Sequence, residues 1–278
     1  MKRTYRWMAC SLLLLLLLLL ALRWGTERSA PAIPETSAAP AESAPPPTEA
    51  PEPAIEETES EERSLTVSIL GDSYSAFKGF TEPASNVAYY PISDPETEGR
   101  GNDVEHAEEM WWYLFAEENG VSILQNDSYS GSPVSYDGYA AGRGDARDYS
   151  FVRRCTSLRP ADLIIIEGGT NDSHAGTAVG EYQYADWEEA DFQTFRPALA
   201  YVLDTVCRAN PSATVVFMLN EGLRSDISES VETVCAHYSV SVLHLSGISR
   251  QNMHPSIEGM RQISDQLTDH LRLLAEQD

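Results

Sequence analysis

The chain has few basic residues and few cysteines. Its 278 residues include 19 Lys and Arg against 43 Asp and Glu, which gives a formal net charge of −24. Nucleic acid and anionic lipid would be repelled by such a protein, so both are disfavoured as partners. The four cysteines do not have the spacing of a zinc site. We therefore expect no metal ion and no other cofactor.

Three cysteines lie outside the N-terminal segment, namely Cys155, Cys207 and Cys235. Cys207 and Cys235 are predicted to lie on helix faces among apolar neighbours, where a thiol behaves as a small hydrophobic group. We expect buried free thiols. The alternative is a disulfide between Cys207 and Cys235, which an exported protein could form.

The chain begins with basic residues followed by an almost unbroken apolar run. Lys2, Arg3 and Arg6 precede the run, which spans 7–22. This order is typical of an export signal, although the run is slightly shorter than the roughly 20 residues of a spanning helix. Ala30-Pro31-Ala32 is a poor cleavage site, so an uncleaved signal-anchor is slightly favoured over a cleaved signal peptide. Both place the domain outside the cytoplasm, either anchored to a membrane through 7–22 or secreted.

Residues 29–62 consist mainly of Pro, Ala, Glu, Ser and Thr, with no Lys or Arg. Such a stretch buries too little apolar surface to fold, which predicts a disordered, extended linker. It is interpreted as a stalk, or alternatively as a segment without function. Residues 1–28 contribute +4 and the linker −9 to the net charge, so residues 63–278 carry −19. This last segment is long enough for one domain.

Within residues 63–278, apolar runs alternate with helical patterns. Strands are predicted at 65–70, 121–125, 163–166, 214–219 and 240–245, the last as an edge strand. Helices are predicted at 106–119, at 145–158 and at 188–209, the last with a kink or a restart at Pro197. Two more are predicted, one after a cap at Asp226 and one from Pro255 onward. This alternation predicts a doubly wound α/β fold with a mainly parallel five-stranded sheet between two helical layers.

Polar residues with catalytic chemistry follow several of these strands. Ser73, Ser130-Gly131 and Asn171 come just after three strand ends, and His254 lies in the loop after the fifth strand. Ligands bind at this edge of a doubly wound sheet. Ser73 is expected to be exposed on a strand-to-helix turn, where a helix N-terminus would add positive potential. The alternative is that Ser73 is an ordinary helix cap.

Four sequence blocks together resemble those of the SGNH (GDSL-type) hydrolase family. They are Gly71-Asp72-Ser73, Ser130-Gly131, Gly169-Thr170-Asn171-Asp172 and His254-Pro255. The resemblance covers the chain from about Leu65 to its C-terminus. It implies a flavodoxin-like strand order of 2-1-3-4-5 and esterase activity.

The resemblance also implies roles for four residues. Ser73 is the nucleophile and His254 the general base. The oxyanion hole combines the amides of Ser73 and Gly131 with the side chain of Asn171. For Gly131 the alternative is a turn glycine without a catalytic role.

One position departs from the family pattern. The family's acid stands three residues before the histidine, where this chain has Gln251. A neutral oxygen, from the Gln251 side chain or from a main-chain carbonyl, can fix the tautomer of His254, although it cannot stabilise the imidazolium as a carboxylate does. A Ser73–His254 dyad with a neutral orienting group is therefore expected.

Aromatic residues in predicted loops have two equally weighted interpretations: their rings stack on the sugars of a carbohydrate substrate, or they pack a long loop. They are Tyr89, Tyr90, Tyr129, Tyr136, Tyr139 and Trp187. Tyr90, Trp187 and His174 are the candidate substrate-binding residues. The favoured function is an exported esterase that removes small acyl groups, acetyl above all, from a polysaccharide or small-molecule ester. The alternatives are a lipase or lysophospholipase, and a surface glycan-binding protein with little or no turnover.

Overall fold

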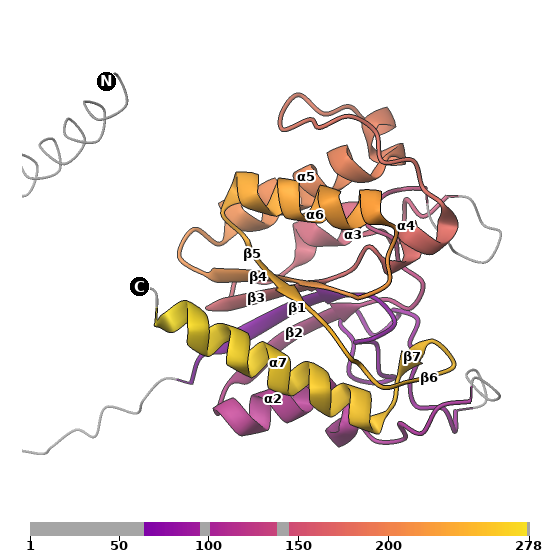
Figure 1. Cartoon of the computed structure of the whole chain (residues 1–278), viewed down its shortest axis with the longest axis vertical. Coiled ribbons are helices and arrows are strands. Elements are labelled where there is room, and N and C mark those ends of the chain that lie inside the picture. The colour runs from indigo at the N-terminus through magenta and orange to yellow at the C-terminus, as the bar shows by residue number, and fades with distance from the viewer. Residues whose placement is uncertain (1–63, 95–100, 138–144, 277–278) are drawn as a thin grey trace, which may run out of the picture. The chain divides into compact units, whose positions relative to one another are not determined.

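The computed structural model describes residues 64–94, 101–137 and 145–276 (Figure 1). The predicted signal or anchor (1–28), the whole of the predicted linker (29–62) and Tyr139 lie outside these ranges. Within the described ranges, no helix has the length and apolar character to cross a bilayer.

The centre of the domain is a five-stranded parallel sheet in the order β2-β1-β3-β4-β5. The strands are β1 (Thr66–Gly71), β2 (Ser122–Ser128), β3 (Leu163–Glu167), β4 (Thr214–Leu219) and β5 (Ser241–His244). The central strand β3 reads Leu-Ile-Ile-Ile-Glu and is buried throughout, as a strand covered on both faces must be. The predicted strand order is confirmed, and β5 is an edge strand as expected.

Helices cover both faces of the sheet (Figure 1). On one face, α2 (Trp111–Asn119) and α7 (Ile257–Ala275) pack against the apolar side chains of one core cluster. On the other face, α3 (Phe151–Arg154), α5 (Phe195–Ala209) and α6 (Ser225–Tyr238) enclose a second cluster. The predicted three-layer α/β/α architecture is therefore correct.

Several helix boundaries differ from the prediction. The segment 145–158 forms only the single turn of α3 and the 3-10 turn η2 (Cys155–Ser157). The predicted helix over 188–209 does restart, as Pro197 led us to expect, but at Thr194 instead of at the proline. It divides there into η3 (Glu189–Gln193) and α5, so Pro197 lies in the first turn of α5. There its missing N–H costs no helical hydrogen bond.

Two helix starts also differ. The first helical pattern becomes η1 (Ala107–Glu109) followed by α2. The N-cap of α6 is Arg224, and Asp226 lies in the first turn instead of capping the helix.

A short antiparallel hairpin precedes α7, where the sequence predicted that Pro255 would open the helix. It consists of β6 (Arg250–Gln251) and β7 (His254–Pro255). Asn252 and Met253 form its two-residue turn, and both have positive φ, 48° and 69°. Two positive φ values are typical of a type I′ turn. The hydroxyl of Ser256 then caps α7 by accepting a hydrogen bond from Gly259 N.

The three cysteines of the domain are free thiols. Cys155 and Cys235 are buried, whereas Cys207 is only partly buried. The alternative of a Cys207–Cys235 disulfide is therefore not realised.

Candidate active site

The hairpin brings His254 to Ser73, although 181 positions separate them in the sequence. Nε2 of His254 lies 2.9 Å from the Oγ of Ser73, which is the contact a general base needs with its nucleophile. Ser73 lies in a turn after β1 and no helix follows it, so the expected helix N-terminus is absent. The expectation that Ser73 is exposed is also wrong, because only 7% of the residue is accessible.

The other ring nitrogen of His254 faces a main-chain oxygen. Nδ1 lies 3.2 Å from the carbonyl oxygen of Asn252, inside the turn of the hairpin. The amide of Gln251 instead donates to Asp103 Oδ2 over 2.8 Å. Of the two expected neutral groups, the carbonyl therefore occupies the orienting position. The assignment of Gln251 to that role is corrected, because its side-chain nitrogen is directed at another loop.

The imidazole also lies against two aromatic side chains that pattern reasoning did not assign to the catalytic group. The ring of Tyr89 stacks on His254 with centroids 3.5 Å apart and an interplanar angle of 11°. The ring of Tyr74 lies 5.5 Å away, and its hydroxyl donates to Met253 O over 2.8 Å. An aromatic face favours a cation placed over it, so Tyr89 is suited to stabilise the imidazolium form. Tyr89 was named only among the aromatic residues of predicted loops, and nothing in the sequence placed it against the histidine.

Two backbone amides next to the nucleophile are available as donors. Among the described residues, neither Ser73 N–H nor Gly131 N–H has a hydrogen-bond acceptor. Gly131 has a φ of +79°, which L-residues adopt only with strain, so the backbone conformation at this position favours glycine. Adjacent free amides are the donors that an oxyanion hole requires.

Asn171, at the start of α4 (Thr170–Ala175), lies between the loops that carry Ser73 and Gly131. Its Nδ2 donates to Ser132 O over 2.9 Å and to Asp72 Oδ2 over 3.1 Å. The site thus brings together Ser73, Gly131, Asn171 and His254. Asn171 can donate to a substrate only if the N–H that now faces Asp72 turns toward it.

Asp72 and Glu167 form a buried carboxyl pair beside the nucleophile. Asp72 N donates to Glu167 Oε2 over 3.4 Å, and Glu167 Oε1 accepts from Asn220 Nδ2 over 2.8 Å. Burial raises the pKa of Asp72 to about 6. Burial, together with repulsion from Asp72, raises the pKa of Glu167 well above its usual range. The raised pKa values favour a neutral carboxyl group in this pair, which avoids two negative charges side by side.

A third buried carboxyl group fixes the loop that follows Gly131. Asp172 Oδ2 accepts from Val134 N over 2.7 Å, and its Oδ1 accepts from Ser135 N and from Ser135 Oγ. These three donors offset part of the cost of burying the carboxylate. Asp172 of the Gly-Thr-Asn-Asp block thus has a structural role. It holds the loop 130–135, called the oxyanion loop below, against α4.

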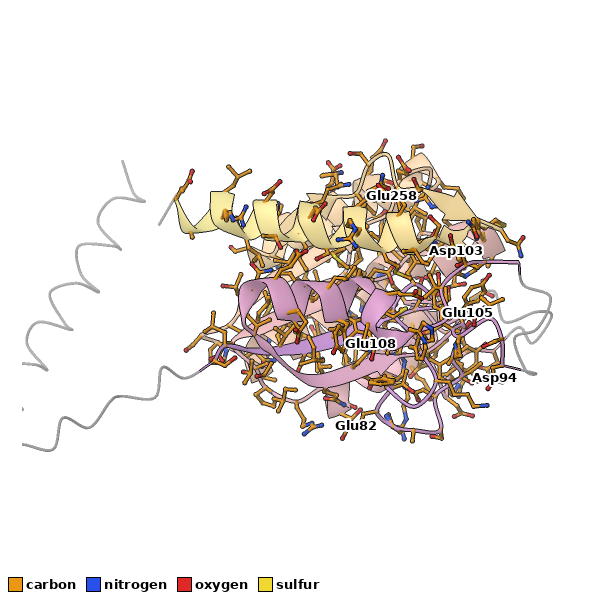
Figure 2. All side chains as sticks on the ribbon, turned by 90° about the horizontal axis from the view of Figure 1, so that it is seen from below. Glu82, Asp94, Asp103, Glu105, Glu108 and Glu258 are labelled. Carbon is orange, nitrogen blue, oxygen red and sulfur yellow. The ribbon has the colours of Figure 1, made fainter. Side chains whose placement is uncertain are left out.

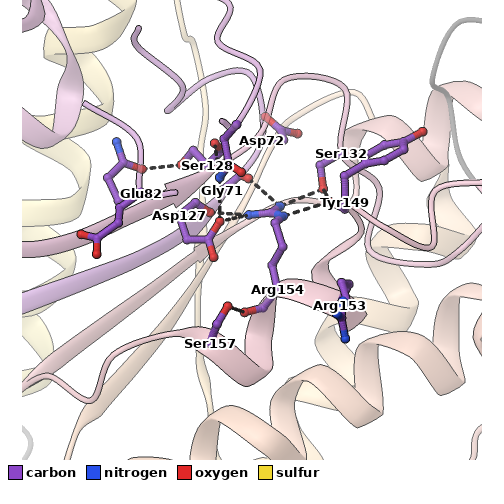
Figure 3. A network of polar contacts seen from close by, with 12 residues as sticks. Gly71, Asp72, Glu82, Asp127, Ser128, Ser132, Tyr149, Arg153, Arg154 and Ser157 are labelled. Atoms are coloured by element: carbon purple, nitrogen blue, oxygen red, sulfur yellow. Dashed lines mark hydrogen bonds and ion pairs between the residues drawn. The ribbon is translucent and has the colours of Figure 1, made fainter. Parts of the chain in front are cut away.

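Arg154, the last residue of α3, is only 5% exposed and crosslinks the segments around the nucleophile (Figure 3). Its Nη2 donates to Gly71 O (3.0 Å) and Ser132 Oγ (2.8 Å), and its Nε donates to Tyr149 O (2.9 Å). Its Nη1 donates to Asp127 Oδ1 over 3.0 Å and to Asp127 O. Every N–H of the guanidinium group therefore has an acceptor.

The structure corrects one of the predicted substrate-binding residues. Tyr90 is fully buried and its hydroxyl donates to Pro255 O, so it supports the histidine hairpin instead of facing a ligand. Trp187 is partly buried against the core and its Nε1 donates to Gln183 O, and its contact with substrate stays a prediction. His174 is exposed on α4, three residues after Asn171, and its contact with substrate stays a prediction.

A polar cavity of about 360 Å³ adjoins the loop that carries Gly131. It is lined by residues that include Asn86, Asp127, Tyr129, Asp148 and Arg153. Tyr129 directly precedes Ser130-Gly131, so this cavity opens beside the oxyanion loop. Its charged and amide side chains suit a hydroxylated ligand better than a hydrocarbon chain.

Comparison with known proteins identifies a family over almost the whole domain. Residues 65–271 match the sequence profile of the family described as GDSL-like lipase/acylhydrolase. A search of curated proteins returned no match.

Solved structures share this fold. A structure described as a GDSL-like lipase from Bacteroides uniformis is 39% identical, with a TM-score of 0.72 over 76% of this chain and 97% of that chain. A second, from Bacteroides ovatus, is 38% identical with a TM-score of 0.72, over 76% of this chain and 99% of that one. A carbohydrate esterase is 19% identical with a TM-score of 0.51, over 76% and 69% of the two chains, and is similar in fold alone.

Arg154→Met should lower the free energy of unfolding by about 3–5 kcal/mol, because it leaves the buried carboxylate of Asp127 without its cation. Urea denaturation measures the loss. Arg153→Met, at the exposed neighbouring position, is the matched control and should change stability by less than about 0.5 kcal/mol. Adding Asp127→Asn to Arg154→Met should recover part of the loss. Equal effects of the two arginine substitutions would contradict this account.

Glu167→Gln should flatten the dependence of stability on pH. Since the folded pKa of Asp72 (about 6) lies above its unfolded value, the pair stabilises the fold below about pH 4 and this contribution is lost as the pH rises through 6. The decrease in unfolding free energy between pH 4 and pH 8 should be smaller in Glu167→Gln than in wild type by about 1–3 kcal/mol. Glu117→Gln, at an exposed position, should keep the wild-type decrease.

Proposed function

The chain belongs to the GDSL-like lipase/acylhydrolase family of ester hydrolases, and we propose that it is a serine esterase that removes small acyl groups, acetyl above all, from carbohydrate esters outside the cytoplasm. The 2.9 Å contact between His254 Nε2 and Ser73 Oγ carries the catalytic part of this proposal. The substrate and the location rest on further arguments.

Catalysis begins when Ser73 Oγ attacks the carbonyl carbon of the ester. His254 Nε2 takes the hydroxyl proton, and the carbonyl π electrons move to the oxygen to give a tetrahedral oxyanion. The imidazolium then gives its proton to the departing alcohol, leaving an acyl-serine. A water molecule, deprotonated by His254, repeats the sequence and releases the acid.

The oxyanion receives hydrogen bonds from the two unpaired amides of Ser73 and Gly131. Asn171 becomes the third donor when its N–H leaves Asp72 Oδ2, the longer of its two contacts at 3.1 Å. The Asp72 carboxylate then keeps its bond from Tyr74 N, and the Asp72 N–H still donates to Glu167 Oε2. Because burial raises the pKa of both carboxyl groups, a protonated form of the pair is favoured over two bare charges when this exchange takes place.

The surroundings of Ser73 favour a small acyl group on a polar alcohol. Ser73 is only 7% exposed, and such a buried nucleophile favours a small acyl group over a bulky one. The cavity beside the oxyanion loop is lined by charged and amide groups, which can hydrogen-bond sugar hydroxyls. This polarity favours a carbohydrate ester over a long-chain lipid, which makes a lipase or lysophospholipase the second choice.

The proposed location follows from the N-terminal sequence. A basic start, an apolar run over 7–22 and an acidic, proline-rich linker suit a domain held away from a membrane, or one that is secreted. Cell-surface and environmental polysaccharides are the substrates within reach of such a domain.

Ser73→Ala should abolish release of p-nitrophenol from its esters without lowering the melting temperature by more than a few degrees. Wild type should cleave the acetate at least about tenfold faster, in kcat/KM, than the octanoate, which corresponds to about 1.4 kcal/mol. A fluorophosphonate probe should label Ser73, as peptide mapping would show, and Ser93→Ala, at an exposed serine, should remain active. Octanoate preference would favour a lipase, and absence of Ser73-dependent release would favour the glycan-binding alternative.

Asn171→Ala should lower kcat/KM by about 10²–10³ through kcat, since it removes one oxyanion donor. Steady-state kinetics on the acetate ester would measure both constants. Asn119→Ala, whose amide bonds Phe115 O and Thr268 on another part of the fold, is the control. An increase in KM with kcat unchanged would make Asn171 a substrate-binding residue instead.

A further inference from the structure

A loop far from His254 in sequence holds the backbone on both sides of it. The side-chain Nδ2 of Asn102 lies 3.2 Å from Gln251 O, 3.3 Å from His254 O and 3.0 Å from Pro255 O. The Oδ1 of Asn102 accepts from Val104 N over 3.1 Å, which fixes the amide. One side chain thus gathers three carbonyl oxygens of the β6–β7 hairpin.

The next residue, Asp103, uses both carboxylate oxygens on the same segment. Its Oδ2 accepts from Gln251 Nε2 over 2.8 Å, before the histidine, and its Oδ1 accepts from Ile257 N over 2.9 Å, after it. Gln251 and His254 are directly paired across the hairpin, so their side chains leave it on the same side. The carboxylate of Asp103 therefore lies one side chain away from the catalytic imidazole.

We propose that Asp103 is a positioning residue for His254, which supplies from a neighbouring loop the negative charge that this hairpin lacks and holds the hairpin in place through Gln251 and Ile257. The proposal rests on the Ser73–His254 catalysis proposed above. It accounts for glutamine at position 251, because an amide can donate to Asp103 whereas a carboxylate there would repel it.

The carbonyl of Asn252 and the carboxylate of Asp103 have different roles toward His254, because only the carboxylate is charged. The carbonyl of Asn252 accepts from Nδ1 and fixes the tautomer, but it carries no net charge to favour the imidazolium. A carboxylate bonded to the neighbouring side chain adds that attraction at longer range, reduced by solvent. Asp103 thus complements the carbonyl instead of replacing it.

Other charged groups also contribute to the electrostatic potential around the hairpin. Arg250 is paired with Glu221 over 2.8 Å, and Glu105 accepts from Ser93 N. Glu258 lies in the first turn of α7. Figure 2 shows Asp103, Glu105 and Glu258 on the face of the molecule that α2 and α7 cover. Of these acids, Asp103 is the one bonded to the cross-strand partner of His254.

The first test is Asp103→Asn, with Glu105→Gln as the control that removes one charge from the same loop. An asparagine can still accept from Ile257 N and can donate to Gln251 once that amide is turned, so the contacts stay while the charge is lost. The acidic limb of kcat/KM against pH should move to lower pH by roughly 0.3–1 unit in Asp103→Asn, because the imidazolium loses an attractive charge. Glu105→Gln should leave it in place.

The second test asks whether Asp103→Asn changes kcat in opposite directions in wild type and in the Gln251→Asp variant. Gln251→Asp places a carboxylate against Asp103 and should lower kcat severalfold. Adding Asp103→Asn removes that repulsion, so Asp103→Asn should raise kcat in the Gln251→Asp background although it lowers kcat in wild type. A role in packing alone predicts the same loss in both backgrounds. An acidic limb that does not move relative to Glu105→Gln, or an equal loss in both backgrounds, overturns the proposal.

The rate at which a fluorophosphonate labels Ser73, measured across the same pH range, repeats both tests without a substrate ester. Labelling needs the serine and its base but no particular acyl group or alcohol. Failure of the proposed function would appear as unlabelled Ser73 in wild type. Failure of the present proposal would appear as labelling of wild type with no effect of Asp103→Asn on its pH dependence. Melting temperatures of all variants exclude loss of fold as the cause.

Discussion

The buried guanidinium of Arg154 is the interaction on which the catalytic edge of the sheet depends. A charge taken out of water is costly unless all of its donors are satisfied. Here the five N–H groups reach the end of β1, the end of β2, the oxyanion loop and the chain before α3. These segments must therefore meet around the guanidinium group. As a result, the loops that carry Ser73 and Gly131 are held close together.

The position of the general base His254 is likewise fixed by contacts from several segments. His254 stands on a two-residue hairpin whose turn has two residues with positive φ, so the turn is held by its neighbours instead of by glycine. Tyr74 donates to that turn, Tyr89 stacks on the ring, and the Asn102-Asp103 loop binds both sides of it. Orientation by a carbonyl and charge from another loop together take over the task of a single triad carboxylate.

Much of the architecture could be predicted from the sequence, because the relevant signals are local. Buried parallel strands appear as continuous apolar runs, and polar residues just after them mark the edge where ligands bind. The predicted strand 214–219 matches β4, and four short blocks were enough to place Ser73, Gly131, Asn171 and His254 together. Short turns of helix gave no such signal, so 145–158 was wrongly predicted as one long helix.

The sequence by itself determined the alternation of strands and helices and the two helical layers, since periodicity encodes them. The resemblance of its motif blocks to a known family implied the strand order and the residue types at the catalytic centre. Only the tertiary structure decided what those residues touch. Tyr90 is buried under Pro255, Gln251 bonds Asp103, and the oxygen on His254 Nδ1 belongs to Asn252. The first two of these contacts join residues 165 and 148 positions apart, so they depend on the direction of side chains in the packed fold, which no local pattern records. The third lies within the two-residue turn of the hairpin, which the sequence did not predict.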